Sequence, residues 1–497
     1  MRDHIRFYLG DTLYDLSGFS PTLTVLDWLR EQRGRTGTKE GCNEGDCGAC
    51  TVLVARLDGG PPDAPRLAWR AVNACIQFVS MLDGAQLFTV EDLRASDGTL
   101  HPVQQAMVDL HGSQCGFCTP GFVMSMVAYR KQPGAVAEDG PIDDALAGNL
   151  CRCTGYAPIV RAMKQAMAAG SDRFDAQAAA IADRLSALRD GQTVHVSGPA
   201  GRLTIPADAD ALAATLLADP EATIVAGATD VGLWVTKGLR TLPHVVAIGQ
   251  VPDLKRLDRT ADGLRIGAAV TYEDARDALA GLLPDAGEIV RRIGSTQVRN
   301  AGTVCGNIAN GSPIGDGPPV FIAAGATLHL RRGDVRRNMP LEDYFLAYGQ
   351  QDRQPGEFVE GVTIPALRQG QVFRAYKVSK RFDQDISALL GAFALTLDDA
   401  GTITDARIAF GGMAATPKRA RATEEALRGH PWSEATLQAA RAAIATDFAP
   451  ISDMRASDWY RRTVAANLLT RLFAETAPGA RRPETRLAGR SEAAIHA

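Results

Sequence analysis

The sequence predicts a multidomain α+β protein, in which small sheets and helices form several separate cores. The chain has 497 residues, more than one hydrophobic core normally organises, so three or four domains are expected. Strand-like alternation occupies the first part of the chain, helical spacing follows, and strands and helices then alternate again. The expected divisions are residues 1–88, 89–168, 192–367 and 368–475, with a linker at 169–191 and a flexible tail at 476–497.

The first division opens with a hairpin pattern. Residues 5–16 alternate apolar and polar side chains around the turn pair Gly10 and Asp11, and residues 22–34 then show helical spacing before a glycine. Together they predict a small mixed sheet with one helix.

Helical patterns dominate the second division. They cover residues 101–112, 121–132, 142–150 and 157–169, which glycine, proline and cysteine pairs separate. A compact helical domain is expected. The alanine-rich stretch up to Gly191 has weak amphipathic character, which is typical of a linker or a surface helix.

The later divisions alternate strands and helices and contain two glycine-rich loops, at residues 225–232 and 300–319. Further strands are predicted at residues 372–379, 388–398 and 403–412, and helices follow to about Glu475.

Composition limits the classes of function. The net charge is −4 and the basic residues are scattered, so nucleic acid is not an expected partner. No apolar run approaches the roughly 18 residues that cross a bilayer, and the first residues lack a secretory pattern. We therefore expect a cytoplasmic protein without a membrane partner.

Cysteine usage points to the first third of the chain. Nine cysteines, an odd number in a sequence without an export signal, favour metal or redox chemistry over structural disulfides. Eight of them lie between Cys42 and Cys153. The remaining one, Cys305, is expected to be a small buried thiol.

The first cysteine set has the spacing of plant-type 2Fe-2S ferredoxins: Cys42, Cys47, Cys50 and then Cys75. Glycines among them permit the backbone angles and close amide approach that a loop around an anionic cluster needs. Zinc sites usually use two closely spaced cysteine pairs, and no such pair precedes Cys47 and Cys50. The prediction is therefore a 2Fe-2S cluster.

The second cysteine set consists of two pairs, Cys115 with Cys118 and Cys151 with Cys153. Each pair stands directly before a predicted helix, and helix N-termini favour a negatively charged cluster. A structural zinc site stays open on spacing alone. The ferredoxin-like motif nearby favours a second redox centre.

The two glycine-rich loops predict a dinucleotide site. Residues 223–235 read as strand, glycine loop and helix, which presents backbone N–H groups to phosphate, but a tight turn would explain Gly227 and Gly232 equally well. The loop at residues 300–319 is long and polar, as is typical of a segment that wraps a ligand.

The motifs "GCNEGDCGAC", "QCGFCTPG" and "NLCRCTGY", with both glycine-rich loops, resemble those of the molybdenum hydroxylases, the xanthine dehydrogenase and aldehyde oxidase family. The resemblance extends over nearly the whole chain. It implies a β-grasp ferredoxin-like domain, a four-helix-type iron–sulfur domain, an α+β FAD-binding domain and a C-terminal α+β flavoprotein subdomain.

The resemblance also implies roles for individual residues. The ligands of one 2Fe-2S cluster would be Cys42, Cys47, Cys50 and Cys75, and those of the other Cys115, Cys118, Cys151 and Cys153. The pyrophosphate region of FAD would lie at Ala226, Gly227, Ala228, Thr229, Asp230, Val231 and Gly232. The flavin and its ribityl-phosphate arm would lie at Thr303, Gly306, Asn307, Asn310 and Asp316, with Lys377 near the cofactor.

Two further positions stand out in this comparison. Gln114 would approach the molybdopterin, as the matching glutamine does in the family. Ile293 is a departure, because family members often have an aromatic residue at this position that stacks on the flavin.

The same resemblance implies an NAD-dependent xanthine dehydrogenase of two kinds of subunit. Hypoxanthine and xanthine would be oxidised to urate on a molybdopterin-binding large subunit, so no catalytic residue for that step is expected here. Electrons would pass through the helical-domain cluster, the ferredoxin-like cluster and FAD to NAD. A heterotetramer with two copies of each chain is expected.

Other functions stay open at this stage. Carbon monoxide dehydrogenases of the family carry their iron–sulfur and flavin domains on different chains, so their fusion here argues against that activity. The alternatives are electron transfer for an aldehyde or N-heterocycle dehydrogenase, a molybdenum-free NADH-oxidising iron–sulfur flavoprotein, and a zinc-stabilised scaffold.

Overall fold

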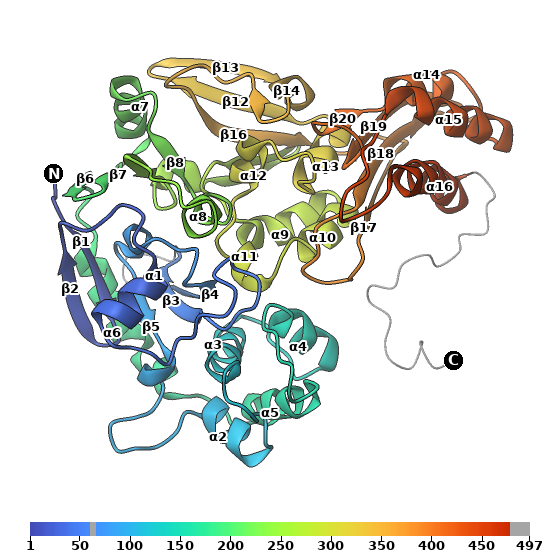
Figure 1. Ribbon diagram of the computed structural model, residues 1–497. Coiled ribbons are helices and arrows are strands. Elements are labelled where there is room, and N and C mark those ends of the chain that lie inside the picture. The colour runs from blue at the N-terminus through green and yellow to red at the C-terminus, as the bar shows by residue number, and fades with distance from the viewer. Residues whose placement is uncertain (60–65, 478–497) are drawn as a thin grey trace. The chain divides into compact units, whose positions relative to one another are not determined.

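The computed structural model describes residues 1–59 and 66–477 (Figure 1). The chain forms two compact units that are discontinuous in sequence. The first comprises Met1–Lys255, Thr271–Glu273 and Gly294–Thr303, and the second Arg256–Val270, Asp274–Ile293 and the chain from Val304 onward. From residue 478, the predicted flexible tail lies outside the described residues. None of the described helices is long and apolar enough to cross a membrane.

The first unit begins with a five-stranded sheet of order β2-β1-β5-β3-β4. Its strands are β1 (Ile5–Leu9), β2 (Thr12–Leu16), β3 (Thr51–Leu57), β4 (Leu67–Asn73) and β5 (Gln86–Phe88). The predicted hairpin is confirmed, since Leu9 pairs with Thr12 across a turn in which Gly10 has a φ of 53°. The predicted helix is α1 (Val25–Asp27), which continues as a π-helical turn, Trp28–Gln32.

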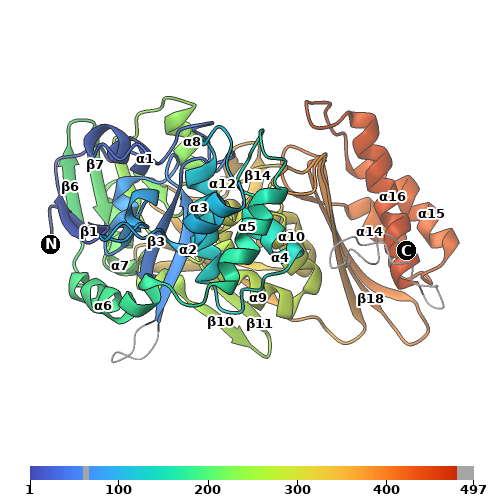
Figure 2. The ribbon, with the colours of Figure 1, turned by 90° about the horizontal axis from the view of Figure 1, so that it is seen from below.

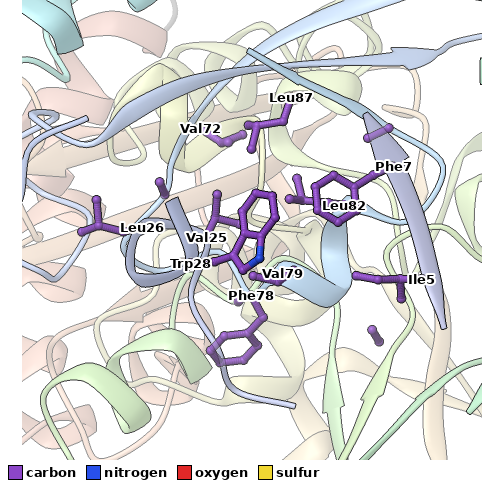
Figure 3. Packing of buried hydrophobic residues seen from close by; sticks show 14 of the residues in the cluster. Ile5, Phe7, Val25, Leu26, Trp28, Val72, Phe78, Val79, Leu82 and Leu87 are labelled. Atoms are coloured by element: carbon purple, nitrogen blue, oxygen red, sulfur yellow. The ribbon is translucent and has the colours of Figure 1, made fainter. Parts of the chain in front are cut away.

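The core of this sheet is centred on Trp28 (Figure 3). Its indole ring meets the Phe7 and Tyr14 rings edge-on, at centroid distances of 5.1 and 5.3 Å. The same core continues into a second sheet through residues such as Val194 and Val245. The two sheets of the first unit therefore share one hydrophobic interior.

The predicted helical domain is confirmed as four helices: α2 (Pro102–Asp109), α3 (Thr119–Arg130), α4 (Asp139–Leu146) and α5 (Ala157–Ala168). The stretch proposed as a linker contains α6 (Arg173–Leu188). Phe174, Ile181 and Leu185 of α6 are buried in the same core as α2–α5, so this segment is a packed helix.

The rest of the first unit is a four-stranded sheet of order β6-β7-β9-β8, with helices α7, α8 and α11. The bounds are β6 (Val194–Gly198), β7 (Gly201–Ile205), α7 (Ala209–Ala218), β8 (Thr223–Val225), α8 (Val231–Thr236), β9 (His244–Ala247) and α11 (Thr296–Arg299).

The second unit contains a five-stranded sheet of order β10-β11-β16-β12-β13 and the short pair β14 and β15. The strands are β10 (Leu257–Thr260), β11 (Gly263–Gly267), β12 (Thr327–Arg332), β13 (Val335–Pro340), β14 (Phe345–Ala347), β15 (Gln350–Gln351) and β16 (Phe358–Pro365). The helices are α9 (Tyr272–Leu282), which starts in the first unit, α10 (Pro284–Arg291), α12 (Val304–Asn310) and α13 (Gly317–Ala324).

A four-stranded antiparallel sheet of order β17-β18-β19-β20 completes the second unit, with α14, α15 and α16 beside it (Figure 2). Its elements are β17 (Gln371–Val378), β18 (Leu389–Leu397), β19 (Ile403–Gly411), β20 (Lys418–Arg419), α14 (Arg421–Leu427), α15 (Glu434–Asp447) and α16 (Asp458–Thr476). Leu427, Leu437 and Leu469 of the helices are buried against Phe393 and Phe410 of the sheet.

Candidate cofactor sites

The first cysteine set occupies the loop before β3 and the residues after β4. Backbone N–H groups of Asp46 and Cys47 donate to Cys42 Sγ at 3.4 and 3.3 Å. The hydrogen bond between the Cys42 and Cys47 thiols lowers the pKa of Cys42 to about 5 and raises that of Cys47. Hydrogen bonding with Cys50, followed by burial, raises the pKa of Cys75. The four thiols thus lie close enough to influence one another's pKa values.

The second cysteine set lies at the starts of α3 and α5. Hydrogen bonding to Cys115 raises the pKa of Cys153, so the two thiols lie near each other. Burial, followed by a hydrogen bond with the Cys151 thiol, raises the pKa of Cys118 to about 12. The structure therefore brings the two halves of the motif together.

A 2Fe-2S cluster takes four thiolates, two on each iron, whereas tetrahedral zinc needs four donors around one ion. Among the described residues, no group of three or more His, Cys, Asp or Glu side chains is placed around a single metal position. Four thiolates suit a 2Fe-2S cluster at each set, and backbone N–H groups already point at Cys42.

Exposure differs between the two sets. Cys50 and Cys75 are buried, whereas Cys115 and Cys153 are exposed. Gln114, next to Cys115, is exposed as well. The second set is therefore the more exposed of the two.

Within the first unit, the predicted pyrophosphate loop connects β8 to α8. It makes a tight turn in which Gly232 N–H donates to Ala228 O at 2.7 Å, and Ala228 has a φ of 59°. A Cβ on Gly227 would stand 1.8 Å from Ala301 O, so packing alone requires glycine there. Thr303, on the segment after α11, is 4 % exposed.

This loop also contacts the first cysteine region. Gln77 Nε2 donates to Gly227 O at 3.0 Å, and a Cβ on Gly232 would lie 2.8 Å from Ile76 O. Lys237, just after α8, donates to Cys42 O at 2.6 Å. The residues next to Cys75 and the predicted pyrophosphate loop are therefore direct neighbours.

The second unit holds the other predicted flavin residues. Gly306, Asn307 and Asn310 lie on α12, and Asp316 directly precedes α13. Lys377, far along the chain on β17, donates from Nζ to Asp316 Oδ2 at 2.7 Å.

Both oxygens of the Asp316 carboxylate accept hydrogen bonds from this chain. Ser387 Oγ donates to its Oδ1 at 2.5 Å, while Lys377 Nζ also donates to Arg292 O at 2.8 Å. The Lys377 side chain is 1 % exposed and that of Asp316 8 %. The pair is a buried ionic lock that fixes the end of the α12–α13 loop.

Three residues near this lock, Arg291, Arg292 and Phe382, make contacts that the sequence pattern does not predict. The Arg292 guanidinium lies 4.4 Å from the centre of the Phe382 ring, and the Arg291 guanidinium 5.1 Å from it. Arg292 also donates to Lys377 O at 3.2 Å. Only the folded chain reveals these contacts, because about 90 residues separate the partners.

Two positions singled out by the sequence have ordinary surroundings. Ile293 is half-buried at the end of α10. Cys305 is buried, donates to Ile266 O at 3.7 Å, and burial raises its pKa to about 12. The expectation of a small buried thiol at Cys305 is confirmed.

Comparison with known proteins identifies four matching families. The descriptions are 2Fe-2S iron-sulfur cluster binding domain (residues 19–80), 2Fe-2S binding domain (89–164), FAD binding domain in molybdopterin dehydrogenase (199–367) and CO dehydrogenase flavoprotein C-terminal domain (374–476).

Among curated proteins, xanthine dehydrogenase 2 of Arabidopsis thaliana is 30% identical over 494 residues, which cover 86% of this chain and 36% of that protein. Xanthine dehydrogenase of Emericella nidulans is 30% identical over 503 residues, which cover 90% of this chain and 36% of that protein. The chain therefore spans about a third of the length of these relatives.

Among solved structures, a carbon monoxide dehydrogenase chain from Hydrogenophaga pseudoflava is similar with a TM-score of 0.52 and 26% identity. The match covers 55% of this chain and 96% of that chain.

Proposed function

Because the chain belongs to the molybdenum hydroxylase family, we propose that it is the iron–sulfur and FAD subunit of a xanthine dehydrogenase. The enzyme would oxidise hypoxanthine and xanthine to urate and deliver the electrons to NAD. The observation that supports this most is that eight cysteines, in two sets, lie in one compact unit that also carries part of the matched FAD-binding region.

When bound, two 2Fe-2S clusters supply one-electron carriers and FAD supplies a two-electron store, so that single electrons from a molybdenum centre can leave as hydride on NAD. The chain's part is to hold these groups. We propose the two cysteine sets as the cluster ligands.

For FAD, we propose the segment from Ala226 to Gly232 and the residues Thr303, Gly306, Asn307, Asn310, Asp316 and Lys377. The lock between Asp316 and Lys377 supports this assignment, because it fixes the loop that carries the polar side chains. Buried charges of this kind orient a site when all their hydrogen bonds are made.

The molybdenum centre is proposed to lie on a partner subunit, in a heterotetramer with two copies of each chain. The relatives are almost three times as long as the matched region, which supports a need for further protein. Exposure of Gln114, Cys115 and Cys153 supports contact between this face and the partner. A reducing cytoplasm would keep the thiols available for iron.

A second candidate is electron transfer for another molybdenum hydroxylase, acting on aldehydes or N-heterocycles. The similarity to the carbon monoxide dehydrogenase chain favours keeping it, since that match also covers more than half of this chain. The shared architecture does not distinguish substrates, because the proposed oxidation takes place elsewhere.

The test is purification of the native complex. We expect about four irons and one flavin per chain, from two 2Fe-2S clusters and one FAD, with molybdenum in a co-purifying subunit and xanthine-dependent formation of NADH. Oxidation of aldehydes or N-heterocycles in place of xanthine would support the second candidate. A complex without molybdenum would refute both and leave an NADH-oxidising flavoprotein.

A further inference from the structure

Four polar side chains meet in the interior of the first unit. They are Thr51 on β3, Ser125 on α3, Asn149 just before Cys151, and Gln297 on α11, and each is at most 3 % exposed. Gln297 Nε2 lies 3.2 Å from Thr51 Oγ1 and 3.1 Å from both Ser125 Oγ and Asn149 Oδ1. We call this set the amide hub.

The amide hub binds the backbone of the first cysteine loop. Asn149 Nδ2 donates to Gly48 O at 3.0 Å, and Thr51 Oγ1 donates to the same oxygen at 2.6 Å. Ser125 Oγ donates to Asn149 Oδ1 at 2.6 Å, which fixes the orientation of that amide. The loop that carries Cys47 is thereby attached to the residue two positions before Cys151.

A direct main-chain contact lies beside the amide hub. Leu150 N–H donates to Cys47 O at 3.0 Å. Cys47 belongs to the first cysteine set, and Leu150 is the residue before Cys151 of the second. One hydrogen bond thus connects the main chains of the two sets, within one residue of a thiol on each side.

Glycines make this approach possible. A Cβ on Gly48 would lie 2.1 Å from Gly148 O, and one on Gly121 would lie 2.2 Å from Gly48 O. A Cβ on Gly148 would lie 2.0 Å from Gln297 Oε1. Three different segments are therefore packed backbone to backbone, at distances that leave no room for a side chain.

We propose that Asn149 and Gln297 are positioning residues for electron transfer between the two proposed clusters. They hold the hydrogen bond from Leu150 to Cys47 in place, and this bond is the connection through which the Cys151 and Cys47 thiolates communicate. In the step, the cluster held by the second set is oxidised by one electron and that held by the first set is reduced by one. No bond forms or breaks, and no proton moves. This inference rests on the part of the proposed function that gives the chain two 2Fe-2S clusters.

Burial explains why the whole hub is needed. Because the four side chains are buried, losing one amide leaves its partners without a hydrogen bond, and the loops must rearrange to reach new partners. Gln297 comes from the region matched as FAD-binding, so the segment that serves the flavin also sets the separation of the cysteine loops.

The test compares the purified complex carrying Gln297→Leu, Asn149→Leu or Ser125→Ala with the unaltered complex. Gln86→Leu is the matched control, because Gln86 is also a fully buried amide of this unit and donates to Gly10 O, away from the cysteine loops. Each protein is reduced with dithionite and examined by electron paramagnetic resonance for the magnetic splitting between the two clusters.

We expect the three hub variants to retain the iron content and both cluster signals while the splitting is lost or shifted, least in Ser125→Ala. The control should keep the native splitting. Native splitting in all the hub variants, or the same change in Gln86→Leu, would overturn the inference. If the leucine variants do not fold, Ser125→Ala decides, since it removes a single oxygen.

A failure of the proposed function can be distinguished from a failure of this inference. Dithionite reduces the clusters directly, so the measurement requires neither a purine nor NAD. A protein that is inactive with xanthine and NAD but responds as expected in the splitting would refute the function and retain the inference.

Discussion

At the scale of single residues, the lock between Asp316 and Lys377 gives the most direct test of the flavin site. We expect Asp316→Ala to lower FAD occupancy, because removing one partner of a buried ion pair costs about 3–5 kcal/mol and releases the loop that precedes α13. The flavin absorbance per chain measures the FAD occupancy. The control is Asp334→Ala, an exposed aspartate of the same unit.

Unchanged flavin content in Asp316→Ala would show that the loop assignment is wrong. Lys377→Met should have a similar effect through the other half of the lock, since it leaves the carboxylate buried without its cation.

A second residue-scale prediction concerns Gly227. We expect Gly227→Ala to displace the loop after β8, because the added Cβ would stand 1.8 Å from Ala301 O. FAD content and the unfolding midpoint in urea should both fall. Gly140→Ala is the matched control, because a Cβ there would meet nothing within 4 Å. A normal flavin content in Gly227→Ala would separate this loop from the cofactor.

At the same scale, the sequence predicts the cysteine sets but not the amide hub. Cluster ligands follow a local spacing, so Cys42, Cys47 and Cys50 are recognisable without a fold. Asn149 stands inside a motif that attracts attention for its cysteines, Gln297 lies just before the second glycine-rich loop, and 148 positions separate the two. Nothing local distinguishes a hub amide from a surface amide.

At the scale of elements, α6 shows how a charged cap attaches a helix. Asp172 precedes α6 and accepts from Phe174 N–H at 2.9 Å, from Lys131 Nζ at 2.5 Å and from His101 Nε2 at 3.0 Å. Burial alone would raise the pKa of Asp172, but the hydrogen bonds from His101 and Lys131 outweigh it and hold this pKa well below its usual value. The stabilisation is therefore present above about pH 4 and is lost as the pH falls below it.

We expect Asp172→Asn to reduce the hydrogen-exchange protection of the α6 amides near pH 7, by an amount equivalent to about 3 kcal/mol. The difference from the unaltered protein should shrink as the pH falls below about 4, because the Asp172 carboxylate of the unfolded chain gains a proton there while that of the folded chain stays ionised. Asp183→Asn, an exposed position on the same helix, is the control. A difference that does not depend on pH would contradict this account.

Most elements of the molecule are predictable from periodicity, and the exceptions are instructive. The pattern of α2 to α5 and of β17 to β19 predicts the observed elements. The weak amphipathic signal of α6 leaves a linker and a helix equally open, because its alanines contribute little to the pattern and Phe174 does much of the packing. Apolar spacing also cannot distinguish the π-helical turn at Trp28–Gln32 from an α-helix.

At the scale of the whole molecule, the proposed order of electron carriers can be tested with Cys118→Ser. We expect loss or distortion of the second cluster, with slower turnover from purine to NAD and nearly normal reduction of the flavin by NADH. The reason is that NADH would reduce the flavin directly, and the flavin comes after the affected cluster in the proposed order. Iron analysis and the two assays measure it, and equal loss of both activities would count against the order.

The domain boundaries remain a prediction at this scale. The matched family regions run in the expected order, but the compact units cross them, since Gly294–Thr303 belongs to the first unit and the residues on either side belong to the second. Sequence patterns detect segments with similar composition, whereas compact units depend on contacts that pass over long stretches of chain.

The place of Gln297 in the first unit has a consequence for biosynthesis. Thr51, Ser125 and Asn149 leave the ribosome well before the glutamine that completes their hydrogen bonds. Domains otherwise tend to fold in the order in which they are made. Here the cysteine-bearing region can collapse early, but it reaches its final packing only after residue 303 has been synthesised. Nascent chains that stop short of α11 would therefore carry all eight cysteines in a looser frame, so the proposed cluster ligands reach their final arrangement only after α11 has been made.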